Sequence, residues 1–318
     1  MTFRVLFRST IWLAAIAVSL FFVAPATWYL LKTQSQSPYC TSGKGLLDMR
    51  VQLARESAAE RIVKNMRKVG DDRNLSLSQW ESPNGRFWVP AGSPMLLAYL
   101  LAQQQSDIYG DAELGVRKGD VVIDCGAHVG VFVKKALSRG ARLVVAVEPA
   151  PQAAECLRRN FSDEIRSGTV IVCQKAIWDK PEMALKFYLN GNGDAADSLV
   201  WHAKGVAVVE VKTTTIDAIA ADYHLDRIDF IKADIKGAAA SMLQGAKVTL
   251  AHSGPRMAIS TEEGFDHPAE IAALVNSIAP NVYRSECGPC VTAAGRIFTD
   301  VMFFNRGAGP LTIDNARM

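Results

Sequence analysis

One short loop limits the folds open to this chain more than any other feature. It reads Asp124-Cys125-Gly126-Ala127-His128-Val129-Gly130, follows the apolar run Val121-Val122-Ile123 and precedes a helical pattern over 131–138. A strand, a tight glycine turn and a helix start in this order present backbone N–H groups to a ligand that approaches the main chain closely. The loop therefore predicts an open α/β sheet with a ligand site beside the glycines.

The glycine spacing and two acids indicate which ligand this is. A dinucleotide fingerprint reads G-x-G-x-x-G, whereas only Gly126 and Gly130 are present here. Asp124 closes the strand, where a carboxylate repels a pyrophosphate and suits a ligand that carries ammonium and sulfonium groups. Glu148 ends the next apolar run, where it can accept hydrogen bonds from both ribose hydroxyls. These residues favour S-adenosylmethionine; a dehydrogenase and a coincidental glycine turn are the alternatives.

From about residue 115 the chain alternates short apolar runs with helical patterns, which predicts a mostly parallel sheet with helices on both faces. Expected strands cover 121–123, 143–147, 170–173, 228–233, 257–260 and 301–304. Expected helices cover 131–138, 151–160, 215–223, 237–245 and 268–277. Two alternating segments, 185–189 and 206–211, are expected to form a side hairpin or insertion.

The N-terminal region predicts a membrane anchor. Arg4 and Arg8 precede an apolar run from Ser9 to Leu31 that Lys32 closes, and about 20 apolar residues suffice to span a bilayer. The alternatives are a signal peptide cleaved near Ala24-Pro25-Ala26 and a buried helix. Basic residues on both sides leave the orientation open. Because S-adenosylmethionine is made in the cytosol, we expect a single-pass protein with its catalytic domain on the cytoplasmic face of the membrane.

The region between the anchor and the domain combines a linker with helices. Residues 33–45 have a polar linker composition, and apolar residues recur at helical spacing from Leu47 to Met66. This amphipathic helix is expected to dock on the domain, with pairing to a second copy or binding to anionic lipid as alternatives. Residues 70–93 are rich in turn residues, and a further helix is expected near 93–105. The predicted division is 1–32 anchor or signal peptide, 33–94 linker and amphipathic helix, 95–306 catalytic domain and 307–318 tail.

Composition excludes several other classes of protein. With 35 basic and 32 acidic residues the net charge is +3, and without a dense basic stripe nothing indicates a nucleic-acid partner. Six cysteines are too few for a disulfide-built scaffold of 318 residues. Cys287-Gly288-Pro289-Cys290 is expected to form a turn between late strands, with a redox pair as the alternative. No metal site is expected, because the histidines are scattered singly and no second C-x-x-C pair is present.

Four ordered motifs carry a family resemblance. They are 121–130, Val145-Ala146-Val147-Glu148-Pro149, Thr213-Thr214-Thr215-Ile216-Asp217 and 228–238. Over about residues 95–306 the chain resembles the FkbM-type family of S-adenosylmethionine-dependent methyltransferases. The resemblance implies a class I Rossmann-like methyltransferase fold and methylation of a hydroxyl on a sugar-containing or polyketide-like acceptor. For a membrane-tethered enzyme a lipid-linked acceptor is a further candidate. The cofactor-binding residues expected from the loop, Glu148 and the resemblance are Asp124, Gly126, Ala127, His128, Gly130, Glu148, Pro149 and Ser198.

The motif at 228–238 departs from the family pattern where catalysis is expected. Asp234 is the candidate catalytic residue, either as the base or as the group that orients the acceptor, with a helix cap or turn acid as the alternative. Lys236 and Ala239 stand where the family usually carries glutamates. The local charge therefore differs by about three units. Either the acceptor differs, or the domain binds cofactor with little turnover and acts as a membrane-tethered interaction module.

Overall fold

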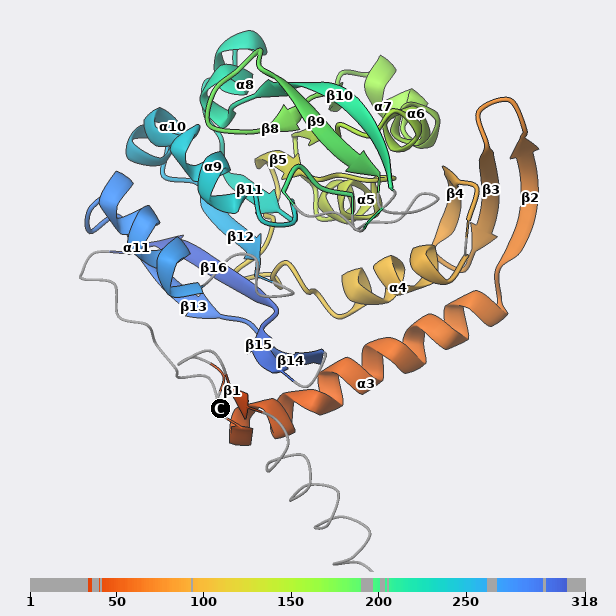
Figure 1. The fold of residues 1–318 in the computed structure, drawn as a ribbon, viewed down its shortest axis with the longest axis horizontal. Helices are drawn as coiled ribbons and strands as arrows, with labels where there is room; N and C mark the ends of the chain where they lie inside the picture. The colour runs from red at the N-terminus through yellow and green to blue at the C-terminus, as the bar shows by residue number, and fades with distance from the viewer. Residues whose placement is uncertain are drawn as a thin grey trace, which may run out of the picture.

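Figure 1 shows the protein as a computed structural model of the chain. It describes residues 34–35, 40, 42–92, 94–189, 197–200, 204, 206–261, 268–293 and 296–307. The expected anchor with its apolar run 9–31, most of the linker and nearly all of the tail lie outside these ranges. Within the described ranges no helix combines the length and the apolar character that a membrane crossing needs. The anchor, its orientation and its cleavage remain predictions.

A seven-stranded sheet forms the centre of the molecule, in the order β13-β16-β12-β11-β5-β6-β7. The five strands from β12 to β7 pair in parallel, and β16 runs antiparallel to both of its neighbours. Their bounds are Val121–Cys125 (β5), Leu143–Val147 (β6), Val170–Cys173 (β7), Phe230–Ala233 (β11), Arg256–Ser260 (β12), Tyr283–Cys287 (β13) and Val301–Arg306 (β16). The expected α/β fold with a mostly parallel sheet is confirmed.

The register of the parallel strands brings three strand ends together at one edge of the sheet. Cys125 of β5 lies opposite Val147 of β6 and opposite Ala233 of β11. The residues that follow these positions therefore leave the sheet side by side, although they are far apart in the chain. In a parallel α/β sheet this carboxyl edge is where ligands bind.

Helices cover both faces of the sheet, as expected. On one face α5 and α6 bury Phe132, Val133 and Leu157 against Val122 and Phe230. On the other face lie α8 to α11, whose apolar side chains pack on the same strands from the opposite side. The helix bounds are Val131–Ser138 (α5), Pro151–Asn160 (α6), Ser162–Arg166 (α7), Ile216–Asp222 (α8), Ala239–Gln244 (α9), Lys247–His252 (α10) and Pro268–Ile278 (α11).

A small sheet beside α6 contains the expected side hairpin. Ala184–Leu189 (β9) and Ala207–Thr214 (β10) pair antiparallel, and Ala176–Ile177 (β8) pairs in parallel with β10. Phe187 and Val211 of this hairpin bury their side chains together with Ala153 of α6. The hairpin therefore packs on α6, the helix that follows β6.

The N-terminal part of the domain is more ordered than the turn-rich composition of 70–93 indicates. Arg67–Asp72 (β2), Leu77–Ser82 (β3) and Gly85–Pro90 (β4) form an antiparallel sheet between Ser42–Lys64 (α3) and Pro94–Gln105 (α4). The turn residues lie in two tight hairpins, and the strands between them bury Leu77, Phe87 and Val89. The expected turns are therefore present, the strands that they join were not predicted, and both flanking helices are confirmed. In Figure 1 α3 runs along α4 toward this sheet.

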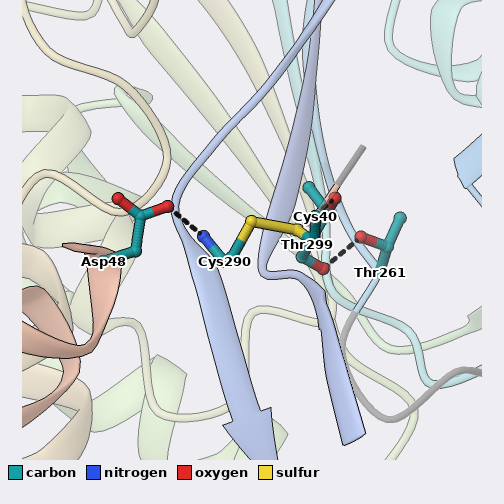
Figure 2. The surroundings of a disulfide bond; sticks show 5 residues. All are labelled: Cys40, Asp48, Thr261, Cys290 and Thr299. Carbon is teal, nitrogen blue, oxygen red and sulfur yellow. Dashed lines mark hydrogen bonds between the residues drawn. A yellow bond between two sulfur atoms is a disulfide. The ribbon is translucent and has the colours of Figure 1, made fainter. Parts of the chain in front are cut away.

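A disulfide joins the N-terminal segment to the end of the chain, which the cysteine count did not predict. Cys290–Ala293 (β14) and Arg296–Thr299 (β15) form a hairpin, and Gln34–Ser35 (β1) pairs with β15. Cys290 bonds to Cys40 (Figure 2). The turn expected at 287–290 is present between β13 and β14, but Cys290 is bonded to Cys40 and not to Cys287, so the two cysteines of this motif do not form a redox pair with each other. Part of the predicted linker at 33–45 is therefore held against the domain, because fully buried Cys40 is bonded there.

Candidate active site

The glycine loop packs directly against the end of β11. Gly126 has φ +77°, and a Cβ atom at this position would lie 2.1 Å from the carbonyl oxygen of Asp234. Gly130 has φ +87°, and its missing side chain leaves room for the ring of Phe161. Both glycines are therefore required by the fold itself, since any side chain would separate the loop from its neighbours.

Glu148 is fixed beside the loop by two backbone donors. The N–H groups of His128 and Ala150 donate to its two carboxylate oxygens at 2.8 and 2.9 Å. The side chain is buried, and this burial raises the pKa of Glu148 to about 7, although the two N–H donors work in the opposite direction. Each oxygen keeps a second lone pair, so the carboxylate can still accept two hydroxyl donors.

Asp124 is not a free carboxylate at the ligand site, which corrects the electrostatic argument made from its position in the sequence. It is fully buried, and Lys232 of the neighbouring strand lies 3.0 Å from its Oδ1 atom. Lys232 also donates to the carbonyl oxygen of Gly126 at 2.8 Å. Since the register places Asp124 opposite Lys232, the negative charge is neutralised inside the sheet. Lys232 therefore links Asp124 to the backbone of the loop and stabilises the loop. Asp124 is not available to pair with a cationic ligand.

Asp234 follows β11 at the carboxyl edge, next to the loop. The hydroxyl of Tyr109 donates to its Oδ2 atom at 2.9 Å, and the ammonium group of Lys236 lies 3.5 Å from Oδ1. Burial favours the neutral acid, but Lys236, Lys232 and the Tyr109 hydrogen bond outweigh it and hold the pKa of Asp234 below its usual range. Asp234 is therefore ionised at neutral pH, and both of its oxygens act only as hydrogen-bond acceptors.

Two hollows meet at Gly126, one on each side of the loop. The first is lined by residues that include Val147, Pro149, Phe187, Ser198 and Ile235. The second is lined by residues that include Gln103, Gln104, Tyr109, His128, Lys232 and Asp234. The first hollow lies on the Glu148 side and is largely apolar, with Asp197 as a charged residue in its wall, whereas the second holds Lys232 and Asp234. A ligand that spans both would pass over the glycine.

Comparison with known proteins identifies the family. A model of the methyltransferase FkbM domain matches residues 124–288, more than half of the 318-residue chain. The chain belongs to the FkbM methyltransferase family. The resemblance found in the sequence motifs is therefore confirmed. A search of curated proteins finds no match.

Solved structures with a similar fold include several methyltransferases. An FkbM methyltransferase from Methylobacillus flagellatus is 17% identical with a TM-score of 0.44, and the alignment covers 82% of this chain and 60% of that one. The Trm5b protein from Pyrococcus abyssi is 15% identical with a TM-score of 0.42, covering 76% and 62%. The tRNA m1G37 methyltransferase from M. jannaschii is 14% identical with a TM-score of 0.41, covering 76% and 57%. This chain thus spans about three fifths of each of these proteins.

The site residues expected for an FkbM methyltransferase come together at one edge of the sheet. Gly126, Ala127 and His128 line one or both hollows, and Glu148 holds the loop through His128. The hydroxyl of Ser198 donates to the carbonyl oxygen of Lys236 at 2.9 Å, so Ser198 links the hairpin to the Asp234 turn. Gly130 lies deeper, at the start of α5. Their binding of a cofactor remains a prediction.

Sequence reasoning missed several residues of this site. Lys232 had a usable signal, because a lysine in an otherwise apolar strand needs a buried partner. Tyr109 and Gln103 had none, since they come from the irregular segment before β5 and from α4. Ala239, the first residue of α9, is 1% exposed in the core, so a glutamate there would enter the core instead of the site. Across the described residues no group of three or more ligating side chains forms a metal site.

Proposed function

We propose that this FkbM family protein is an S-adenosylmethionine-dependent methyltransferase that methylates a hydroxyl of a sugar-containing, lipid-linked or polyketide-like acceptor. The observation that carries the proposal is the carboxylate of Glu148, fixed by two backbone donors beside a glycine that admits no side chain. Its remaining lone pairs fit the two hydroxyls of a ribose. The apolar hollow next to it fits a planar base, with Pro149, Phe187 and Ile235 among its walls.

The residues of the second hollow fit the part of the site where the methyl group would meet the acceptor. Bound S-adenosylmethionine supplies a methyl group made electrophilic by the adjoining sulfonium. Asp234 is ionised, and its carboxylate can accept a hydrogen bond from the acceptor hydroxyl and so orient the oxygen. Tyr109 and Lys236 position this carboxylate from either side. A carboxylate with a lowered pKa is a weak base, which favours the orienting role over the role of general base.

The acceptor class is supported by charge as well as by the family. The net charge of +3 and the absence of a dense basic stripe in the sequence argue for an acceptor other than nucleic acid, although some similar structures belong to tRNA methyltransferases. A tether to the membrane at residues 9–31 would place the site near lipid-linked hydroxyl compounds. This part of the proposal rests on the predicted anchor.

Calorimetric titration with S-adenosylmethionine tests the cofactor, and a substitution at Asp234 tests the chemistry. We expect heat of binding from the wild type and its loss in Glu148→Ala. The absence of heat from the wild type would refute the proposal. Asp234→Asn is expected to bind the cofactor like the wild type and to transfer methyl groups to hydroxyl acceptors at least about tenfold more slowly, since a charged hydrogen bond contributes about 1.5–3 kcal/mol. Asp163→Asn, which changes an exposed acid on α7, is the matched control.

A second candidate is a cofactor-binding module with little turnover, and the contact between Lys236 and Asp234 favours it. This ion pair occupies the carboxylate that the acceptor would need. Lys236→Glu removes the ion pair while leaving the core untouched, unlike a glutamate at Ala239. If methyl transfer appears only in Lys236→Glu, the natural protein is the module; transfer by the wild type excludes this candidate.

A further inference from the structure

The disulfide between Cys40 and Cys290 takes no part in the proposed reaction, and it joins residues that are 250 positions apart. Both cysteines are buried, at 0% and 1% exposed, together with the side chain of Ile297. Their Cα atoms are 5.8 Å apart, within the range that a bridge requires. A buried disulfide that reductants do not reach is typical of a structural disulfide, whereas exposed disulfides are reduced more easily.

Hydrogen bonds hold both ends of the bridge in place (Figure 2). The backbone N–H of Cys290 donates to the carboxylate of Asp48 on α3 at 2.8 Å. The Sγ atom of Cys40 lies 3.4 Å from the hydroxyl of Thr299, and the hydroxyl of Thr261 donates to the carbonyl oxygen of Thr299 at 2.6 Å. Segments that the chain separates widely, at 40–48, at 261 and at 290–299, therefore meet at this one bond.

A buried ion pair also holds α3, a few residues after Asp48. Arg55 of α3 pairs with Asp300, and the two side chains are 3% and 0% exposed. The Nε atom of Arg55 also donates to the hydroxyl of Ser106 at the end of α4, at 2.8 Å. Because α4 contributes Gln103 to the wall of the Asp234 hollow, the bridge and the ion pair together fix one wall of the site.

The bridge is selective among the six cysteines of the chain. Cys125, Cys156 and Cys173 are free and buried in the core, and burial raises the pKa of the Cys156 thiol to about 12, which makes it unreactive near neutral pH. Cys287 takes no part in the bridge, although it lies only three positions before Cys290. The fold thus directs Cys290 to one partner, at the far end of the domain.

We propose that this domain folds and works in an oxidising compartment outside the cytosol, where Cys40 and Cys290 form a permanent bond. Disulfides of this kind persist in such compartments and are rare in cytosolic proteins. Two thiols lose two protons, an S–S bond forms between them, and two electrons pass to a protein disulfide oxidant of the compartment, whose own disulfide is reduced. This placement is opposite to the cytoplasmic face expected from the site of S-adenosylmethionine synthesis.

Two consequences follow from this placement. Cys40 comes eight residues after Lys32, the residue that closes the predicted anchor. An extended chain of that length reaches at most about 28 Å, so the bridge would hold the domain close to the membrane surface. A transport step must then supply S-adenosylmethionine to the same compartment. The bridge itself is independent of the proposed function, because it is defined by residues outside the catalytic site.

Thiol counting in the full chain tests the bond. Intact producing cells are quenched with acid, and the denatured protein is labelled with a maleimide mass tag before and after reduction. We expect four tags before reduction and six after it, because two of the six cysteines are bonded. Cys290→Ser is expected to accept five tags before reduction, since Cys40 becomes free. The matched control Cys287→Ser keeps the bond, so it should accept three tags before reduction and five after it.

The outcomes separate the proposal from its rivals. Six tags on the unreduced wild type would overturn the proposal, because both thiols would then be free in the cell. A bonded peptide that contains Cys287 in place of Cys290 would also overturn it. A C-terminal reporter enzyme that needs its own disulfides should be active when fused to the wild type and to Cys290→Ser; an inactive reporter would place the domain in the cytosol. Neither assay involves methyl transfer, so failure here leaves the proposed function to its own test.

Discussion

Glu148 provides a quantitative test of cofactor binding through its dependence on pH. Burial raises the pKa of Glu148 from 4.5 to about 7 in the ligand-free protein, and the adjacent backbone donors only partly offset this effect. A ribose that donates two hydroxyl hydrogen bonds interacts best with the ionised carboxylate. Proton release from Glu148 should therefore accompany binding, and affinity should rise with pH until the group is fully ionised.

The magnitude follows from the fraction of Glu148 that is ionised. With a pKa of about 7, about one molecule in eleven is ionised at about pH 6 and about ten in eleven at about pH 8. If only the ionised form binds, the affinity for S-adenosylmethionine rises about tenfold over this interval, equivalent to about 1.4 kcal/mol. The stability of the ligand-free fold is expected to follow the opposite trend: the raised pKa of Glu148 contributes stability below pH 4.5 that is lost as pH rises through about 7.

The assay is calorimetric titration with S-adenosylmethionine between about pH 6 and about pH 8, in buffers of different ionisation enthalpy so that proton release is counted. Glu148→Gln removes the titrating group, and it should bind more weakly with an affinity that no longer changes with pH. Asp163→Asn alters an exposed acid and should keep the wild-type slope. Equal slopes in the wild type and in Glu148→Gln would refute the assignment of the proton to Glu148.

Three further predictions concern the groups that hold the site together. Lys232→Met leaves the buried carboxylate of Asp124 without its partner, and chemical denaturation should show a loss of about 3–5 kcal/mol near neutral pH. Gly126→Ala places a Cβ atom 2.1 Å from a carbonyl oxygen and should weaken cofactor binding. Gly168→Ala is the control, because Gly168 has a similar φ but no atom within 4 Å of the added Cβ, and it should bind the cofactor normally. Equal binding by both variants would contradict the packing argument. Cys40→Ser should lower the unfolding free energy by about 2–4 kcal/mol, and a strong reductant in the denaturation buffer should do the same to the wild type but not to the variant.

Much of the fold was predictable because it follows from local patterns. The apolar run at 121–123 and the glycines after it specify a strand and a tight turn through side-chain size and backbone freedom alone. The same reasoning located the strand that ends before Glu148 and most helices of the domain. It identified the turn residues of 70–93 but not the strands β2, β3 and β4 that these short turns connect. Alternating buried positions such as Leu77 and Phe87 are a weaker signal than the turns that flank them.

The site was predictable only in part, because its contacts join distant positions. Glu148 and Asp234 were found since each ends a predicted strand, and parallel strands bring such ends to one edge. The Tyr109 hydroxyl that fixes Asp234 lies 125 positions away in an irregular segment, where no periodic pattern marks it. The neutralisation of Asp124 by Lys232 depends on which strands are neighbours and on their register, and neither is visible in a single strand.

The sequence by itself determined the α/β architecture, the glycine loop and the family, because strand and helix periodicity and the order of the motifs are properties of short segments. Only the tertiary structure decided the electrostatics of the site and the bond between Cys40 and Cys290. Charge neutralisation and disulfide pairing depend on distances of a few ångströms between residues that the chain separates widely. Those distances are set by the packing of the whole domain, in which the β14-β15 hairpin lies against α3 and β11 lies beside β5.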